Sequence, residues 1–400
     1  MNKIQFFCII FSIFYVHCLA KNKHVASIPF QMIGTSVVLP IKINNSSTLQ
    51  MILDTGLRTT IVTELLTGDS LDLNAGELQD MQGLGSGKTF QAYESDSNTI
   101  SMGKFNLPNM KVFAFKDDLF SLTRQTGAKI NGLIGADFFR NYVVQIDYTR
   151  RRLRIYDPAA FVTPKGYSSM PMVCERQKMY IQLSVLETDS ARQRIKMLID
   201  TGAELTAWFE TLTNKAVSIP QKSVRAKIGE GLSGEITGVY ARVQQLCIAS
   251  FCVRNPIVAF PDSSAIHGAT TSSNRDGTIG SQLLSRFNLI IDRPGRKFYF
   301  KPNENFDKPF VYNIAGIEIV QSDAFLQQPE IISIWPESPA ERAGLKVGDI
   351  ISEIDNQKTY QMTVSETRHY FEKPSTKPLT ITYERDGDYK TVEISMKAKI

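Results

Sequence analysis

The sequence repeats itself, and this repeat constrains the fold more than any other feature. The string MILDTG at 51–56 recurs as MLIDTG at 197–202, so Asp54 and Asp200 lie 146 residues apart. A glycine-rich segment follows each string at the same offset, and later landmarks follow at an offset of 145. Register kept over about a hundred residues indicates two copies of one structural unit.

Each copy has the pattern of a compact β lobe. Apolar runs of strand length, separated by turn residues such as NSS at 45–47, lead into each Asp-Thr-Gly. The elements LIG at 133–135 and TIG at 278–280 are each followed by one short helix and a hairpin. We therefore predict a mainly β fold, with two pseudo-symmetric lobes at 25–158 and 166–302.

The repeated strings resemble those of the aspartic proteases. The resemblance covers roughly residues 28–302, and it implies two β-barrel lobes of the retropepsin or pepsin type joined in one chain. It also implies that Asp54 and Asp200 are the catalytic pair, one from each lobe. Thr55 and Thr201 would brace the two loops against each other, and Gly56 and Gly202 would allow the loops to approach closely.

Two facing carboxyl groups suit peptide hydrolysis. One activates a water molecule as a base, and the other protonates the leaving nitrogen as an acid. Like charges at that separation cannot both ionise, so the pair shares a proton and titrates as a unit. The expected substrate is an extended peptide or an unfolded protein. This chemistry requires neither a metal nor a cofactor.

The glycine-rich segments are placed where retroviral proteases carry flaps over the substrate. By this resemblance, flexible backbone would let each flap open for a peptide and close over it. The alternative is that each segment is only a hairpin turn. The candidate flap residues are Gly83, Gly85, Gly87, Gly229, Gly231 and Gly234.

The residue after each Asp-Thr-Gly departs from the pepsin pattern, where a serine or threonine is usual. Leu57 and Ala203 stand there instead, and Arg58 follows Leu57. Arg58 could point toward an acid such as Glu204 or lie on the surface, whereas contact with Asp54 would favour the ionised carboxylate and upset proton sharing. The alternative function is therefore a catalytically inactive peptide-binding or scaffolding protein.

The last third of the chain, 308–400, is predicted to be a small β-barrel with two helices. The string SPAERAGLKVGDII at 338–351 resembles bacterial PDZ domains, which bind extended peptides or C-termini by adding a strand to a sheet edge. By this resemblance, Ala315, Gly316 and Ile317 would offer backbone N–H groups to a peptide carboxylate. The alternative is a PDZ domain that packs on the lobes and binds nothing.

The first twenty residues indicate export. Residues 1–20 carry Lys3, an apolar stretch and a small residue at Ala20, as in a secretory signal peptide. An uncleaved membrane anchor and lipidation at Cys18 are the alternatives, and no later segment is apolar enough to span a membrane. We therefore expect a periplasmic or extracellular protein.

Cysteine usage and charge refine this picture. Cys247 and Cys252 flank a four-residue stretch that could turn a hairpin, so a local disulfide is one interpretation and buried thiols, with Cys174, are the other. The cysteines and histidines show no metal-ligand spacing. The net charge of +5 is spread without long basic runs, which argues against a nucleic-acid partner.

Overall fold

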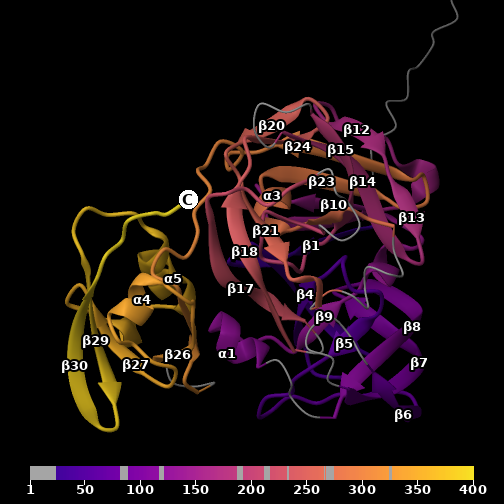
Figure 1. Cartoon of the computed structure of the whole chain (residues 1–400). Coiled ribbons are helices and arrows are strands. Elements are labelled where there is room, and N and C mark those ends of the chain that lie inside the picture. The colour runs from indigo at the N-terminus through magenta and orange to yellow at the C-terminus, as the bar shows by residue number, and fades with distance from the viewer. Residues whose placement is uncertain are drawn as a thin grey trace, which may run out of the picture.

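The computed structural model describes residues 24–81, 89–116, 121–186, 192–210, 217–231, 234–264, 266, 274–323 and 327–400. Within these ranges the protein is mainly β, as predicted, and its strands form four sheets (Figure 1). Two sheets build the lobes, a third joins them, and the fourth forms the C-terminal domain.

The first lobe is an eight-stranded sheet whose centre leads to Asp54. Central β4 is apolar and almost fully buried because other elements cover both of its faces, and it ends one residue before Asp54. A short helix, α1 (Leu122–Thr126), precedes β9, and a 3-10 helix, η1 (Ala136–Phe139), follows it. In sheet order the strands are β2 (Gln31–Ile33), β3 (Ser36–Ile43), β4 (Leu49–Leu53), β9 (Gly132–Ile134), β5 (Thr60–Val62), β8 (Phe105–Phe115), β7 (Phe90–Met102) and β6 (Gly76–Met81).

The second lobe repeats this arrangement around Asp200. Strand β4 pairs in parallel with β9 in the first lobe, and β15 pairs in parallel with β22 in the second. Helix α3 (Ser281–Leu284) takes the place of η1. In sheet order the strands are β17 (Ser223–Gly231), β18 (Gly234–Arg242), β21 (Ile257–Pro261), β16 (Ala207–Phe209), β22 (Gly277–Ile279), β15 (Gln193–Ile199), β14 (Lys178–Leu186), β19 (Gln245–Ile248) and β20 (Phe251–Arg254), with β13 (Val173–Glu175) beside β14.

The second lobe also carries the predicted disulfide. Cys247 and Cys252 face each other across the β19–β20 hairpin and are bonded, and Cys174 is a free, half-buried thiol.

A six-stranded sheet joins the lobes. Its two central strands come from different lobes and pair antiparallel, with Val144 opposite Ile291. Asp147 and Asp292 end these strands and accept hydrogen bonds from turn N–H groups, which supports a structural role for both. In order, the strands are β1 (Ala26–Pro29), β11 (Arg152–Tyr156), β10 (Val143–Asp147), β23 (Phe287–Asp292), β24 (Lys297–Pro302) and β12 (Ser168–Pro171), and the 3-10 helix η2 (Pro158–Ala160) follows β11.

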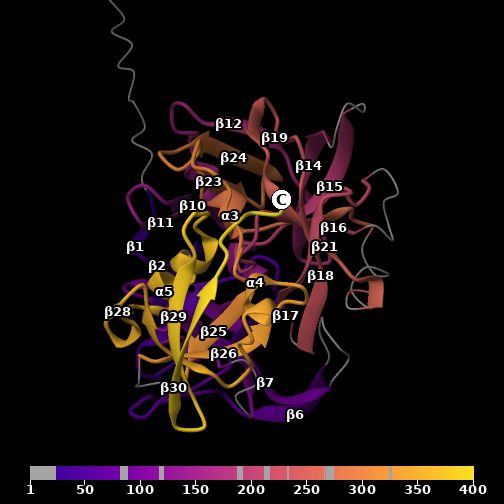
Figure 2. The ribbon, with the colours of Figure 1, turned by 60° about the vertical axis from the view of Figure 1, so that its left-hand side comes forward.

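The C-terminal domain is a small barrel-like sheet with two helices, α4 (Pro339–Arg342) and α5 (Val364–Glu372). Thr363 and Glu366 form a capping box that starts α5. Figure 2 shows the domain in front of the lobes, with which it shares hydrogen bonds. Its strands are β25 (Ile317–Gln321), β26 (Pro329–Ile334), β27 (Ile350–Ile354), β29 (Leu379–Arg385), β30 (Asp388–Ile394) and β28 (Gln357–Lys358), and η3 (Thr359–Gln361) is a 3-10 turn.

Among the described residues, no helix has the length and apolar character needed to cross a membrane.

Candidate active site

Asp54 and Asp200 occupy equivalent loops at the ends of β4 and β15. The backbone N–H of Asp54 donates to Ile134 O at 2.9 Å, and that of Asp200 donates to Ile279 O at 3.0 Å. These bonds fix each loop to the neighbouring parallel strand. Each aspartate therefore directly follows a buried strand and is tied to the neighbouring strand by an equivalent hydrogen bond. This placement explains why an apolar run ends on an acid in both repeats.

Each carboxylate is held by the backbone of its own loop. Asp54 Oδ1 accepts hydrogen bonds from the N–H groups of Gly56 (2.8 Å) and Leu57 (3.0 Å). Asp200 Oδ1 accepts from Gly202 and Ala203, both at 3.1 Å. The second oxygen of each carboxylate takes no part in these loop bonds.

The two threonines lock the loops together. Thr55 Oγ1 donates to Ile199 O at 2.7 Å and accepts from Thr201 N at 3.0 Å. Thr201 Oγ1 donates to Leu53 O at 2.6 Å and accepts from Thr55 N at 3.1 Å. Both side chains are buried, so these four bonds are shielded from water. They brace the two loops against each other, which is the arrangement that the resemblance implies.

The two glycines explain how the carboxyl groups come together. A methyl group added at Gly56 would lie 2.2 Å from Asp200 Oδ2, and one added at Gly202 would lie 2.4 Å from Asp54 Cγ. Such distances are far shorter than van der Waals contact. Each glycine backbone therefore lies directly against the aspartate of the other lobe, and no larger residue fits at either position.

The electrostatics couple the two acids. Desolvation by the surrounding protein, followed by the negative charge of Asp200, raises the pKa of Asp54 well above its usual range. A hydrogen bond between the two carboxyl groups raises it further, against the opposing effect of the Leu57 and Gly56 N–H groups. The pair therefore retains a proton at a pH where an isolated aspartic acid would have lost it.

Family models match two parts of the chain. Residues 39–138 match the family model described as "Aspartyl protease", and residues 330–385 match the one described as "PDZ domain". The chain contains an aspartyl protease domain and a PDZ domain.

A solved structure and the curated proteins complete the comparison. A crystal structure of an aspartic proteinase from Irpex lacteus is similar with a TM-score of 0.41 and 11% identity. The similarity covers 70% of this chain and 97% of that one. No curated protein matches the sequence.

The protease domain carries one described flap candidate. Gly229, Gly231 and Gly234 lie at the end of the β17–β18 hairpin, where Gly231 pairs with Gly234 and a bulge lies between Lys227 and Gly229. A methyl group added at Gly229, two residues before the end of β17, would meet open space. The other flap candidates, Gly83, Gly85 and Gly87, lie outside the described residues.

Arg58 does not contact Asp54. It is exposed, and it forms no ion pair with the described residues. Glu204, which the sequence offers as its partner, instead accepts hydrogen bonds from Thr35 N and Ser36 Oγ, both at 3.2 Å. The direct contact that would favour the ionised form of Asp54 is therefore absent among the described residues.

Sequence reasoning missed the charged residues beside the pair. Burial, followed by the positive charge of Arg275, lowers the pKa of Lys178, while Asp200 and Asp54 partly oppose the shift. Arg275 forms a buried ion pair with Glu210 at 2.7 Å. The only signal in the sequence is that Glu210 ends the apolar run LTAWF, much as Asp54 ends its own run.

The predicted carboxylate-binding loop of the PDZ domain is already satisfied by its own chain. Asn313 Oδ1 accepts from the N–H groups of Gly316 (2.9 Å) and Ile317 (3.3 Å), and the N–H of Ala315 donates to Phe371 O at 3.2 Å. The loop precedes β25, where the sequence places it. Its three N–H groups are thus engaged within the domain rather than offered to a ligand.

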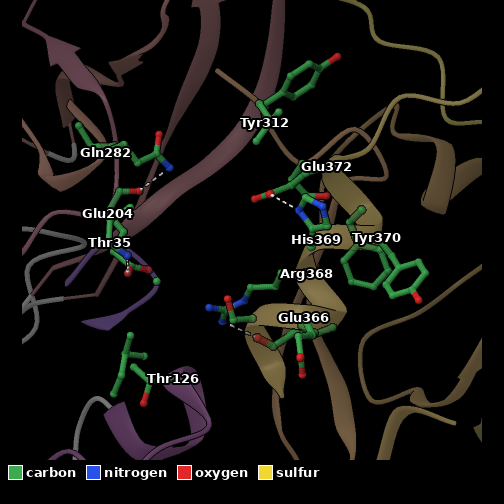
Figure 3. A pocket seen from close by; sticks show the side chains of 18 of the residues that line it. Thr35, Thr126, Glu204, Gln282, Tyr312, Glu366, Arg368, His369, Tyr370 and Glu372 are labelled. Atoms are coloured by element: carbon green, nitrogen blue, oxygen red, sulfur yellow. Dashed lines mark hydrogen bonds and ion pairs between the residues drawn. The ribbon is translucent and has the colours of Figure 1, made fainter. Parts of the chain in front are cut away.

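A large cavity lies between the PDZ domain and the two lobes, beside the direct contacts that join them. Its volume is about 1700 Å³, and Asp54 and Asp200 do not line it. Figure 3 shows side chains of α5, including Arg368 and Glu372, on one side and Thr35 and Glu204 on the other. Glu204, four residues after Asp200, is among the residues that line the cavity. Among the described residues, no cluster of His, Cys, Asp or Glu has the make-up of a metal site.

Proposed function

We propose that the protein is an exported aspartic endopeptidase in which Asp54 and Asp200 activate water, with a PDZ module that binds a peptide or partner segment. The observation that carries this proposal is the direct approach of each loop glycine to the opposite aspartate. That approach, together with the raised pKa of Asp54, supports a proton-sharing pair. An extended polypeptide is the expected substrate.

In the proposed reaction, the pair acts in its singly protonated form. The ionised carboxylate takes a proton from water, and the oxygen of that water bonds to the scissile carbonyl carbon. The protonated carboxyl stabilises the resulting oxyanion, and a proton then passes to the leaving nitrogen as the C–N bond breaks. The loop N–H groups keep Oδ1 of each acid in place, which leaves the other oxygens for water and substrate.

Export rests on two sequence features. Residues 1–20 have the pattern of a signal peptide, and the Cys247–Cys252 disulfide suits an oxidising compartment. We infer a periplasmic or extracellular location on this basis. Detection of a mature N-terminus near Lys21 in the exported protein would support it, and a protein that retains residues 1–20 would contradict it.

The test of the enzyme is cleavage of casein by the full mature chain from acidic to neutral pH. Asp54→Asn and Asp200→Asn should each lower the rate by about 10²-fold to 10⁴-fold, because each removes half of the acid–base pair. Asp307→Asn, an exposed site in the linker between the domains, is the matched control. Cleavage that survives both pair variants rules out the proposed pair, and casein binding without any cleavage favours the scaffold alternative.

A further inference from the structure

The open edge of the PDZ sheet is occupied. Strand β25 is the last strand on one side of its sheet, and PDZ domains add a peptide strand to such an edge. Here two arginine side chains bond to its carbonyl oxygens. Arg368 Nη2 donates to Ile319 O at 2.9 Å, and Arg124 Nε donates to Gln321 O at 2.8 Å. A peptide strand paired at these positions would have to displace both arginines.

The occupant comes from the first lobe of the protease domain. Arg124 belongs to α1, and its Nη2 also forms an ion pair with Glu330 of β26 at 2.9 Å. The same Nη2 of Arg368 donates to Gln125 O of α1 at 2.8 Å, so one guanidinium holds both β25 and the helix. Helix α1 projects from the first lobe toward the PDZ domain in Figure 1.

Close packing accompanies these bonds. The backbone of Gly127, just after α1, lies so near Val364 of α5 that an added methyl group would meet Val364 Cγ2 at 2.9 Å. Strand β25 and helix α5 both contact α1. The helix therefore lies at the groove between β25 and α5, with a glycine at its closest point.

The same helix is connected to the flap candidate of the second lobe. Gln125 Nε2 approaches Glu230 Oε2 at 3.5 Å, and Glu230 lies between two of the flap glycines. Nearby, Tyr240 of β18 stacks on Trp335 of the PDZ domain, with ring centroids 5.7 Å apart. The PDZ domain thus contacts α1 in one lobe and the flap hairpin in the other.

We propose that the ligand of the PDZ groove is helix α1 of the protein's own first lobe, and that an extended peptide binds β25 only by releasing that helix. Release frees Gln125 from the flap hairpin, so groove occupancy and flap mobility are linked. Linkage is reciprocal, so a ligand that strengthens the contact between the flap hairpin and Gln125 also strengthens docking of α1. This inference does not depend on cleavage by the aspartate pair.

The docking contact is tested by hydrogen exchange of the full chain, followed by mass spectrometry. Arg124→Ala and Arg368→Ala should each speed exchange in fragments covering 121–127 and 317–323 by roughly tenfold, since each loses charge-assisted hydrogen bonds. Lys129→Ala is the control near α1, because Lys129 pairs with Asp69 inside the first lobe. His369→Ala is the control on α5, where it is exposed.

The exchange rates of the arginine variants, compared with their controls, decide whether the contact exists. Equal exchange in the arginine variants and their controls would overturn the proposal. Arg124→Lys should give an intermediate rate, because an ammonium group can keep the Glu330 pair but not both contacts. This variant also separates loss of docking from a general loss of folding, which would speed exchange in all fragments.

The competition is tested with a library of random octapeptides selected on the full-length Arg124→Ala/Arg368→Ala protein. Selected peptides should protect fragment 317–323 and bind the wild-type protein at least about tenfold more weakly, because the wild type must first release α1. Peptides that bind both proteins equally, or a selection that yields none, would overturn the competition between α1 and peptides.

Discussion

The two Asp-Thr-Gly loops are alike in their bonds and differ in the two residues after the glycine. Over three residues, each loop makes the same carboxylate bonds, the same threonine brace and the same close glycine contact. The next two positions diverge. The fourth residue is Leu57 in one loop and Ala203 in the other, and the fifth is Arg58 or Glu204.

This difference shows which positions the brace constrains. Leu57 and Ala203 donate backbone N–H bonds of nearly equal length to the carboxylates, so their side chains are free to differ. Glu204 bonds to the turn at 35–36, whereas Arg58 is exposed and acts on Lys178 as a like charge. The pseudo-symmetry is therefore strict from the aspartate to the glycine, and it is lost in the side chains of the next two residues.

The largest effect is expected at the glycines. Gly56→Ala and Gly202→Ala should each lower casein cleavage by about 100-fold or more, because the added methyl group forces the opposite aspartate out of position. Asp307→Asn, at an exposed position outside both loops, is the control. Comparable losses at both loops would confirm symmetry at the pair, and full activity in either variant would contradict it.

The threonine brace should give the next largest effect. Thr55→Val and Thr201→Val remove hydroxyls that each donate one buried bond and accept another, so each should lower the free energy of unfolding by roughly 2–4 kcal/mol. Urea denaturation of the mature protein measures the change.

The control for the brace is Thr278→Val. The Thr278 hydroxyl is buried without a hydrogen-bond partner among the described residues, so its loss should be neutral or stabilising. Losses at Thr55 and Thr201 that differ by more than about 1 kcal/mol would show that the brace is asymmetric.

Much of this site is predictable from sequence because it is repeated. An acid at the end of two equivalent strands must meet its copy if the lobes pair about a pseudo-twofold axis, and the apolar runs indicate those strands. The mainly β fold, the disulfide hairpin and the capping box at Thr363 are predictable from local patterns in the same way.

Contacts between unrelated elements are not predictable in this way. Arg124 and Gln321 are 197 residues apart, and no periodicity or motif links them. The side-chain oxygen of Asn313 accepts hydrogen bonds from the N–H groups of Gly316 and Ile317, so these groups are not available to a peptide carboxylate. No sequence pattern predicts this bond. Lys178 approaches the aspartates only because β14 lies beside β15, so its altered pKa depends on tertiary packing.

A smaller effect is expected from the raised pKa of Asp54. Between the two pKa values of Asp54, the folded protein keeps a proton that the unfolded chain has lost. The contribution of Asp54 to the free energy of unfolding is therefore largest below the ordinary carboxyl pKa, and it is lost as the pH rises through the pKa of the folded state. At neutral pH this titration makes the folded wild type less stable, and an asparagine at position 54 does not titrate. Asp54→Asn should therefore be more stable than the wild type at neutral pH by about 1 kcal/mol or more.

Urea denaturation as a function of pH measures this difference. It should shrink toward zero in acid below about pH 4, where Asp54 is protonated in both folded and unfolded chains. A constant difference at every pH would mean that the charge at Asp54 is not the cause.

The smallest effect is expected where the loops differ. Leu57→Ser and Ala203→Ser each add a hydroxyl beside a carboxylate that already accepts two N–H bonds, so the new bond is partly redundant. It favours the ionised form, and it should move the acidic limb of the pH–rate profile down by less than about one unit and change the rate less than about tenfold. A gain well above tenfold in Leu57→Ser alone would show that leucine impairs the pair, and the two loops would then be unequal in catalysis despite their equal bonds.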